Sequence, residues 1–141
     1  MALRDLSLAA LVVAMTLLAA CATTARVSDE QRLALYAAHA GEPVNSIRYT
    51  TPMGWEAVDD EHLLLNMRPR ESYLLRLDGF CLKQGGSQLA IAVSHQAGVV
   101  SSGFDRVSVS GAQMDCRIRE IRPVDIKAVH DEQRRLDATA S

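Results

Sequence analysis

The first regular pattern of apolar and polar positions in the chain predicts a helix that begins at Ser28. The segment Ser28-Asp29-Glu30-Gln31 has the form of a capping box, in which the serine hydroxyl and the glutamine side chain accept hydrogen bonds from the first amides of a helix. Apolar residues follow at helical spacing at Leu33, Tyr36, Ala37 and Ala40. Gly41 is a typical helix stop, so we expect a helix of about three turns.

After Glu42 and Pro43 the pattern changes to short stretches that suit β-strands. Clusters of Gly, Pro, Ser and Asp separate these stretches, as turns do. In one of them Tyr73, Leu75 and Leu77 share a face opposite Ser72 and Arg76. The predicted strands are residues 46–51, 55–58, 62–67, 72–77, 88–94, 104–110 and 116–121.

About six or seven short strands with frequent turns predict a mainly β (α+β) fold, a small antiparallel barrel or sandwich. Pro123-Val124-Asp125 is expected to end the last strand. Asp125 is placed to cap a short C-terminal helix that runs through Leu136. We therefore expect a single β-rich domain over residues 28–136, followed by a flexible tail at 137–141.

The N-terminus has the pattern of an export signal. A basic residue, Arg4, precedes an apolar run from Leu6 to Ala20 that is shorter than the roughly 20 residues a membrane-spanning helix needs. The run ends in Leu18-Ala19-Ala20-Cys21, which resembles a bacterial lipobox. The alternatives are a buried helix or an ordinary secretory signal. We expect a lipoprotein signal peptide at 1–20 and a lipidated cysteine with a tether at 21–27.

The resemblance to bacterial lipoproteins implies acyl chains on Cys21 and a mature chain that starts there. Several chains anchor a protein firmly, whereas a single chain binds membranes only marginally. In lipoproteins of this type an Asp after the cysteine often signals retention in the inner membrane, and this chain has Ala22. The expected location is therefore the cell envelope, anchored by lipid in the outer membrane and facing the periplasm.

Composition narrows the function classes. The 141 residues contain 15 Lys and Arg against 17 Asp and Glu, a net charge of −2, which argues against a strongly basic nucleic-acid binder. Three cysteines are too few for a disulfide-dense miniprotein. No motif indicates a cofactor or a metal site, so we expect neither.

With Cys21 assigned to the lipid, Cys81 and Cys116 remain. Two cysteines in an exported protein most simply form one disulfide, since the compartment is oxidising. The alternatives are a redox pair or a metal site. The chain has no Cys-x-x-Cys motif, and no histidine stands within two residues of either cysteine.

A row of arginines and the single tryptophan are candidates for an interaction surface. Arg117 and Arg119 alternate with Cys116 and Ile118, so they would share the exposed face of a strand that continues to Arg122. Such a row suits carboxylates, phosphates or a partner chain. The alternative is a solvated face with cross-strand ion pairs to Asp78 or Asp105.

Trp55 follows a Pro-containing turn. It is either a binding anchor or a packing centre in a core with few aromatic residues.

The remaining polar motifs do not form a catalytic constellation. Asp59-Asp60-Glu61-His62 lacks the spacing of a calcium loop and is more typical of a turn. Ser94 and His95 are neighbours on a predicted strand, which would point them to opposite faces. Gly85-Gly86-Ser87 lacks the lysine of a phosphate loop and indicates a hairpin turn. The four histidines are dispersed: His39, His62, His95 and His130.

Most of the region from about residue 28 to 127 resembles a family of small bacterial lipoproteins of unknown function. The most specific match is Cys-Arg-Ile-Arg-Glu-Ile-Arg-Pro-Val-Asp at residues 116–125. The resemblance implies a single exported domain and a Cys81–Cys116 pairing, and it brings no activity. The other matching segments are residues 39–44, 47–49, 54–56, 73–75, 78–81 and 104–107.

The sequence therefore predicts a non-enzymatic, lipid-anchored envelope protein that works as an interaction or accessory module. Its expected partners are the membrane, through the lipid, and an envelope protein. The alternative is an inhibitor or ligand-binding module that acts on an envelope or host hydrolase, an analogy at the level of fold.

Overall fold

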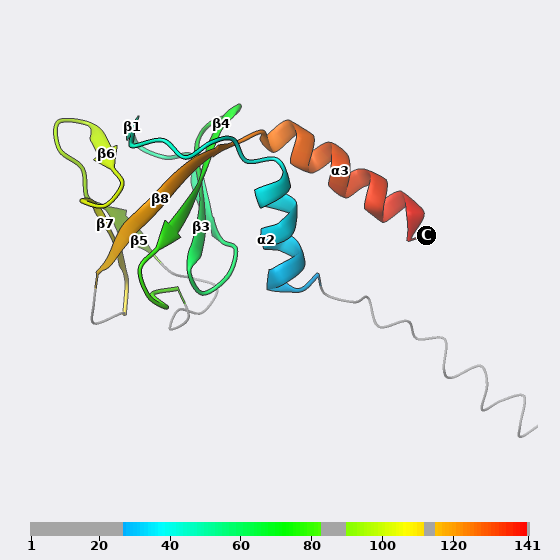
Figure 1. Cartoon of the computed structure of the whole chain (residues 1–141), viewed down its shortest axis with the longest axis horizontal. Coiled ribbons are helices and arrows are strands. Elements are labelled where there is room, and N and C mark those ends of the chain that lie inside the picture. The colour runs from blue at the N-terminus through cyan, green and yellow to red at the C-terminus, as the bar shows by residue number, and fades with distance from the viewer. Residues whose placement is uncertain (1–26, 83–89, 112–114, 141) are drawn as a thin grey trace, which may run out of the picture.

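The computed structural model describes residues 27–82, 90–111 and 115–140 of the chain. It confirms the mainly antiparallel β class, with one helix before the described strands and one after them (Figure 1). A six-stranded sheet curls into a half-barrel, and a two-stranded sheet accompanies it. The elements are α2 Asp29–Ala38, β1 Ser46–Arg48, β2 Gly54–Ala57, β3 His62–Arg68, β4 Glu71–Leu77, β5 Ile91–Val93, β6 Val99–Ser101, β7 Arg106–Val109, β8 Cys116–Val124 and α3 Ile126–Thr139.

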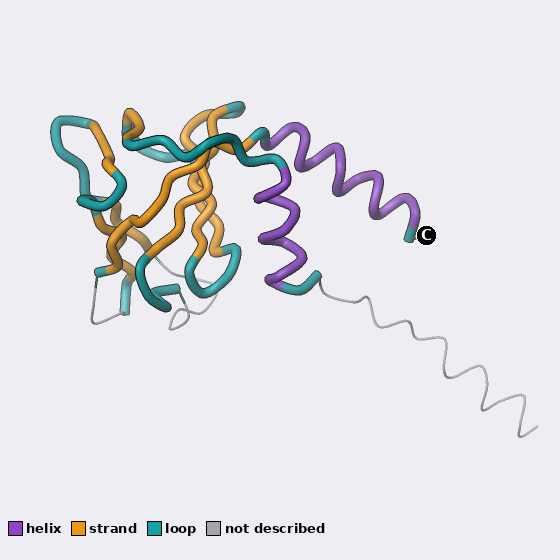
Figure 2. Tube along the Cα trace, viewed as in Figure 1, coloured by secondary structure: helices purple, strands orange, loops and turns teal. Residues whose placement is uncertain are grey.

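The six-stranded sheet has the order β2-β3-β4-β8-β7-β5, with every neighbour antiparallel. The second sheet pairs β1 with β6, which brings residues from the start and the middle of the domain together. The last strand, β8, lies in the middle of the large sheet between β4 and β7 (Figure 2).

Both faces of the central strands are buried, which explains the run Leu63-Leu64-Leu65 in β3. Leu63 and Leu65 belong to the main core, which the two-stranded sheet helps to cover through Ile47 and Val100. Leu64 points the other way, into a second core with Leu74, Val58, Val124 and Val129. Residues of α2 and α3 pack against that second core. The helices thus cover one face of the sheet, and the barrel interior occupies the other.

Helix α2 begins as predicted, because both hydrogen bonds of the capping box form. The amide of Gln31 donates to the Ser28 hydroxyl at 3.2 Å, and the Ser28 amide donates to the Gln31 side chain at 3.0 Å. The expected role of Gly41 as the helix stop is wrong, since the helix ends at Ala38 with His39 as its cap. Gly41 instead approaches β8, where an added Cβ would lie 3.1 Å from Pro123 Cγ.

The expected end of the last strand at Pro123 is also wrong, because β8 continues to Val124. The carbonyl of Pro123 accepts from the Gly41 amide at 2.8 Å. The N–H and C=O positions of one strand residue point to the same side of the strand. Pro123 has no N–H, and its missing donor therefore faces the irregular segment at Gly41 and not β4. The ladder between β4 and β8 therefore loses no hydrogen bond at this proline.

Other boundaries moved in small ways. Strand β6 was not predicted, and positive φ angles at Ala97 and Gly98 form the turn before it. Asp125 caps α3 as expected, with its side chain 3.0 Å from the Ala128 amide. Helix α3 continues past Leu136 to Thr139, supported by ion pairs one turn apart such as Lys127–Asp131. Residues 1–26, with the predicted signal peptide and Cys21, lie outside the described residues, as do the predicted turn at 85–87, the predicted strand start at 88–89 and Ser141.

Cys81 and Cys116 lie at disulfide distance, with their Cα atoms 6.0 Å apart. Cys81 follows β4 in a turn, and Cys116 is the first residue of β8, so the link joins the end of one central strand to the start of its neighbour. Both residues are buried in the main core. Burial of this kind is typical of a structural disulfide, since a redox-active cysteine needs exposure.

We predict that changing both cysteines to serine lowers the free energy of unfolding by about 3–4 kcal/mol, because the link closes a loop of 35 residues in the unfolded chain. Urea denaturation of oxidised wild type and of the double variant measures the difference. Wild type treated with a reductant should match the double variant. Equal midpoints for the oxidised and reduced forms would contradict the link.

Candidate functional site

The structure separates Trp55 from the arginine row. Trp55 lies on β2, half-buried against the main core and opposite the fully buried Leu65. Two strands, β3 and β4, stand between β2 and the arginines of β8. Trp55 therefore packs against the main core, and its role as a binding anchor stays a prediction.

Two of the three candidate arginines on β8 already have partners. The Arg119 guanidinium lies 3.7 Å from Asp78, one of the two ion pairs that the sequence suggested. Arg122 donates through Nε to the carbonyl of Gly41 at 2.8 Å, and so holds the chain after α2 against β8. Both side chains therefore contact other parts of the fold: Arg119 contacts Asp78, and Arg122 contacts the segment after α2.

Arg117 differs, because its neighbour across the sheet is another arginine. The register between β7 and β8 places Arg106 directly opposite Arg117. Both are exposed, and none of the ion pairs among the described residues involves either one. Like charges directly opposite each other in a ladder are destabilising. Sequence analysis missed Arg106, because no local pattern shows which β8 residue it will face.

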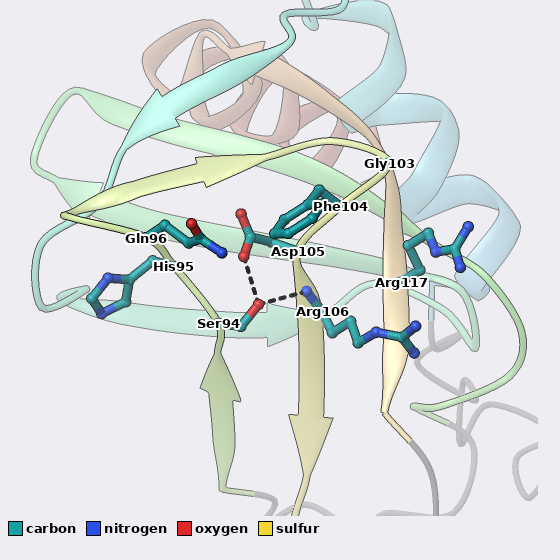
Figure 3. Close-up of a pocket in the computed structure, with 8 residues that line it drawn as sticks. All are labelled: Ser94, His95, Gln96, Gly103, Phe104, Asp105, Arg106 and Arg117. Atoms are coloured by element: carbon teal, nitrogen blue, oxygen red, sulfur yellow. Dashed lines mark hydrogen bonds between the residues drawn. The ribbon is translucent and has the colours of Figure 1, made fainter.

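Arg106 and Arg117 border an open cleft of about 520 Å³ at the end of β5 and the starts of β7 and β8 (Figure 3). The cleft adds one exposed aromatic residue, Phe104, whose side chain is 65% exposed. The lining residues are Ser94, His95, Gln96, Gly103, Phe104, Asp105, Arg106 and Arg117. Among the described residues that line it, Asp105 is the only carboxylate, whereas Arg106 and Arg117 supply two guanidiniums.

Asp105 is buried, with 3% of its surface exposed, and its carboxylate holds the backbone around the cleft through two hydrogen bonds. One oxygen accepts from the Ser94 hydroxyl at 2.7 Å, and the other accepts from the Ser101 amide at 2.7 Å. These bonds tie the end of β5 to the loop between β6 and β7. Because Phe104 and Arg106 flank Asp105 in the chain, the carboxylate fixes the backbone that carries both of them.

Ser94 and His95 line the cleft together but do not form a catalytic pair. The Ser94 hydroxyl donates to Asp105 and accepts from the Arg106 amide at 2.9 Å. The His95 ring packs against Tyr49, with ring centroids 5.1 Å apart. The reason expected from the sequence was alternation along a strand, yet both residues follow the end of β5. Their separate partners keep them apart.

A second cleft of about 360 Å³ lies between α2, α3 and the outer face of β2 and β3. The Tyr36 hydroxyl there donates to Glu56 at 3.1 Å. Burial, together with that carboxylate, raises the pKa of Tyr36 to about 12. The polar groups in this cleft are largely paired with one another, as Ser72 and Asn66 are at 2.7 Å. It therefore offers a ligand less than the first cleft does.

The acidic segment at Asp59 forms a turn. Asp59 accepts from the amides of Glu61 and His62 at 2.8 and 2.7 Å, and from the His62 ring at 2.9 Å. Burial opposes ionisation, but these three contacts outweigh it and hold the pKa of Asp59 below its ordinary 3.8. Among the described residues no three His, Cys, Asp or Glu side chains are grouped to hold a metal.

Fold and cleft together define the chain as a small helix-flanked antiparallel β domain with a cationic surface cleft. The chain belongs to a family of unknown function, DUF6491, whose model matches residues 4–139. No curated protein and no solved structure matches it. Within the described ranges, neither helix has the length and apolarity that crossing a bilayer requires.

We predict that Asp59→Asn lowers the free energy of unfolding at pH 7 by about 1 kcal/mol, since the charged acceptor of the turn is lost. The lowered pKa of Asp59 means that its contribution is present above the ordinary carboxyl value of 3.8 and disappears as the pH falls through the folded value. Urea denaturation between pH 2 and 7 should show the two proteins converging in acid. Asp115→Asn, at an exposed position, serves as the control. A difference that is constant with pH would contradict the assignment.

We predict that Arg117→Gln raises the free energy of unfolding by about 0.2–1 kcal/mol at low salt, because it removes repulsion from Arg106. The gain should shrink as salt screens the pair. Arg119→Gln is the matched control on the same strand, and it should give no gain because Arg119 is paired with Asp78. A loss of stability in Arg117→Gln would show that the two arginines do not repel each other.

Proposed function

We propose that this protein is a lipid-anchored module of the cell envelope whose β domain binds a partner and does not catalyse a reaction. Cys21 would carry the lipid in the outer membrane, and the domain would face the periplasm. The observation that carries the binding role is the Arg106–Arg117 pair, two exposed like charges on adjacent strands at an open cleft. Repulsion between two neighbouring arginines lowers the stability of the fold, and a local arrangement that lowers stability is typical of a functional surface.

The geometry of the cleft supports binding over catalysis. A serine nucleophile needs a base within hydrogen-bond reach, and the Ser94 hydroxyl is occupied by Asp105 and the Arg106 amide. The groups that face outward are guanidiniums, an aromatic ring and an amide, which are recognition groups.

The anchor is tested by Cys21→Ser in full-length protein produced in its own cells. We expect wild type to incorporate labelled palmitate and to sediment with the outer membrane. The variant should lose the label and leave the membrane fraction, because several acyl chains hold a protein on a bilayer and none would remain. Continued labelling of the variant would contradict Cys21 as the lipid site.

The binding role is tested by photo-crosslinking in living cells with the probe in place of Phe104. Leu136, on α3 away from the cleft, is the matched control, since its exposed fraction of 53% is close to the 65% of Phe104. We expect a recurrent protein adduct from position 104 that is absent from position 136 and is reduced when Arg106 and Arg117 are both glutamine. The same adducts from both positions would contradict a binding role for the cleft.

A further inference from the structure

We infer that the Arg106–Arg117 cleft recognises the free carboxylate of a peptide. This inference rests on the proposed binding function and adds the chemistry of the ligand. It follows from the charge of the cleft, from the groups that surround the two arginines, and from the place of the cleft in the molecule.

Among the described residues, no ion pair involves Arg106 or Arg117, whereas Arg76 and Arg119 each lie near a carboxylate. Along β8, Arg119 lies 3.7 Å from Asp78, and Glu120 lies 3.9 Å from Arg76 on β4. At the ladder position of Arg117 the partner strand instead supplies Arg106. The nearby Asp105 directs its two oxygens to Ser94 and Ser101. The chain therefore leaves room for an external anion at this position.

A carboxylate fits between two facing guanidiniums. Partners in an antiparallel ladder project from the same face, with their Cβ atoms about 4.5–5.5 Å apart. Each guanidinium is a planar fork of N–H donors that can bind both oxygens of a carboxylate. An anion that bridges Arg106 and Arg117 also removes the repulsion between them, so the loss of this repulsion adds to the free energy of binding.

The surroundings of the arginines favour a peptide over a bare inorganic anion. Phe104, 65% exposed, gives an apolar surface next to Arg106, and Gln96 gives an amide donor and acceptor on the same lining (Figure 3). A peptide that ends in a carboxylate would use all three kinds of group. Phosphate alone would use only the guanidiniums.

The place of the cleft points to a ligand in the periplasm and away from the anchoring bilayer. Strands β5, β6 and β7 lie on one side of the molecule, and the helices α2 and α3 lie on the other (Figure 1). From Cys21 to Ser28 the chain can reach at most about 25 Å. The start of α2 is therefore the part of the domain held nearest to the membrane, and the cleft is at the opposite end.

The test is a titration of the full-length protein in detergent micelles, followed by the NMR signals of the arginine Nε–H groups. The probes are N-acetyl-Phe-Ala, the same dipeptide with an amidated C-terminus, and inorganic phosphate. We expect the free acid to shift the signals of Arg106 and Arg117 and to leave Arg119 unchanged. Amidation should weaken binding about tenfold or more, since it removes a charged acceptor.

Variants provide a second readout. Arg106→Gln and Arg117→Gln should each lose the response to the free acid, whereas the control Arg119→Gln should keep it. Equal binding of the amide, or phosphate binding as tight as that of the free acid, would overturn the carboxylate assignment. The comparison of acid and amide needs no variant, so it stands even if a substitution disturbs folding. Crosslinks from position 104 would persist if only the ligand class were wrong, which separates this inference from the proposed function.

Discussion

The central position of β8 is the constraint on which the rest of the structure depends. The strand pairs with β4 along one edge and, near its start, with β7 along the other. Farther along that second edge, the amides of Val44 and Gly41 in the segment after α2 donate to carbonyls of β8. Its side chains enter both cores, Ile121 in the barrel and Val124 beneath the helices. Because β8 is the last strand in the chain, neither core is complete until the C-terminal part of the domain has been made. The link at Cys116 fixes the start of the same strand to the end of β4.

The sequence predicted those features that depend on neighbours in the chain. The capping box at Ser28, the cap at Asp125 and the alternation of Cys116 with Arg117 are local, and each appears in the structure. Features that depend on strand pairing were missed or misjudged. Pro123 looked like a strand end because the pattern does not reveal that its missing N–H faces an irregular segment. The candidate site was half predicted for the same reason: Arg117 is visible in the sequence, but Arg106 becomes its partner only through the register of β7 and β8.

Under the proposed binding role, stability and recognition make opposite demands on β8. Elsewhere on β8, Arg119 and Glu120 lie near charges of the opposite sign, and Arg122 donates to carbonyls of the segment after α2. Within the part of the chain that the structure describes, no ion pair involves Arg117, and the residue that faces it across the ladder is Arg106. The buried Asp105 shows that the chain has a carboxylate close by and uses it to brace the loop. The absence of neutralisation at that position is thus a local property of the cleft, consistent with a site that an outside anion completes.

The two ends of the domain are built differently on the same sheet. Helices α2 and α3 cover one face of the sheet at the end where the chain enters, and the second core closes this end. At the other end β5, β6 and β7 are short, and the loops between them carry the cleft. Short strands leave the backbone at their ends free to be shaped by side chains, as the bonds of Asp105 do here. Under the proposed lipid anchor at Cys21, a rigid sheet that holds such loops away from the tether would present the proposed binding surface to the periplasm.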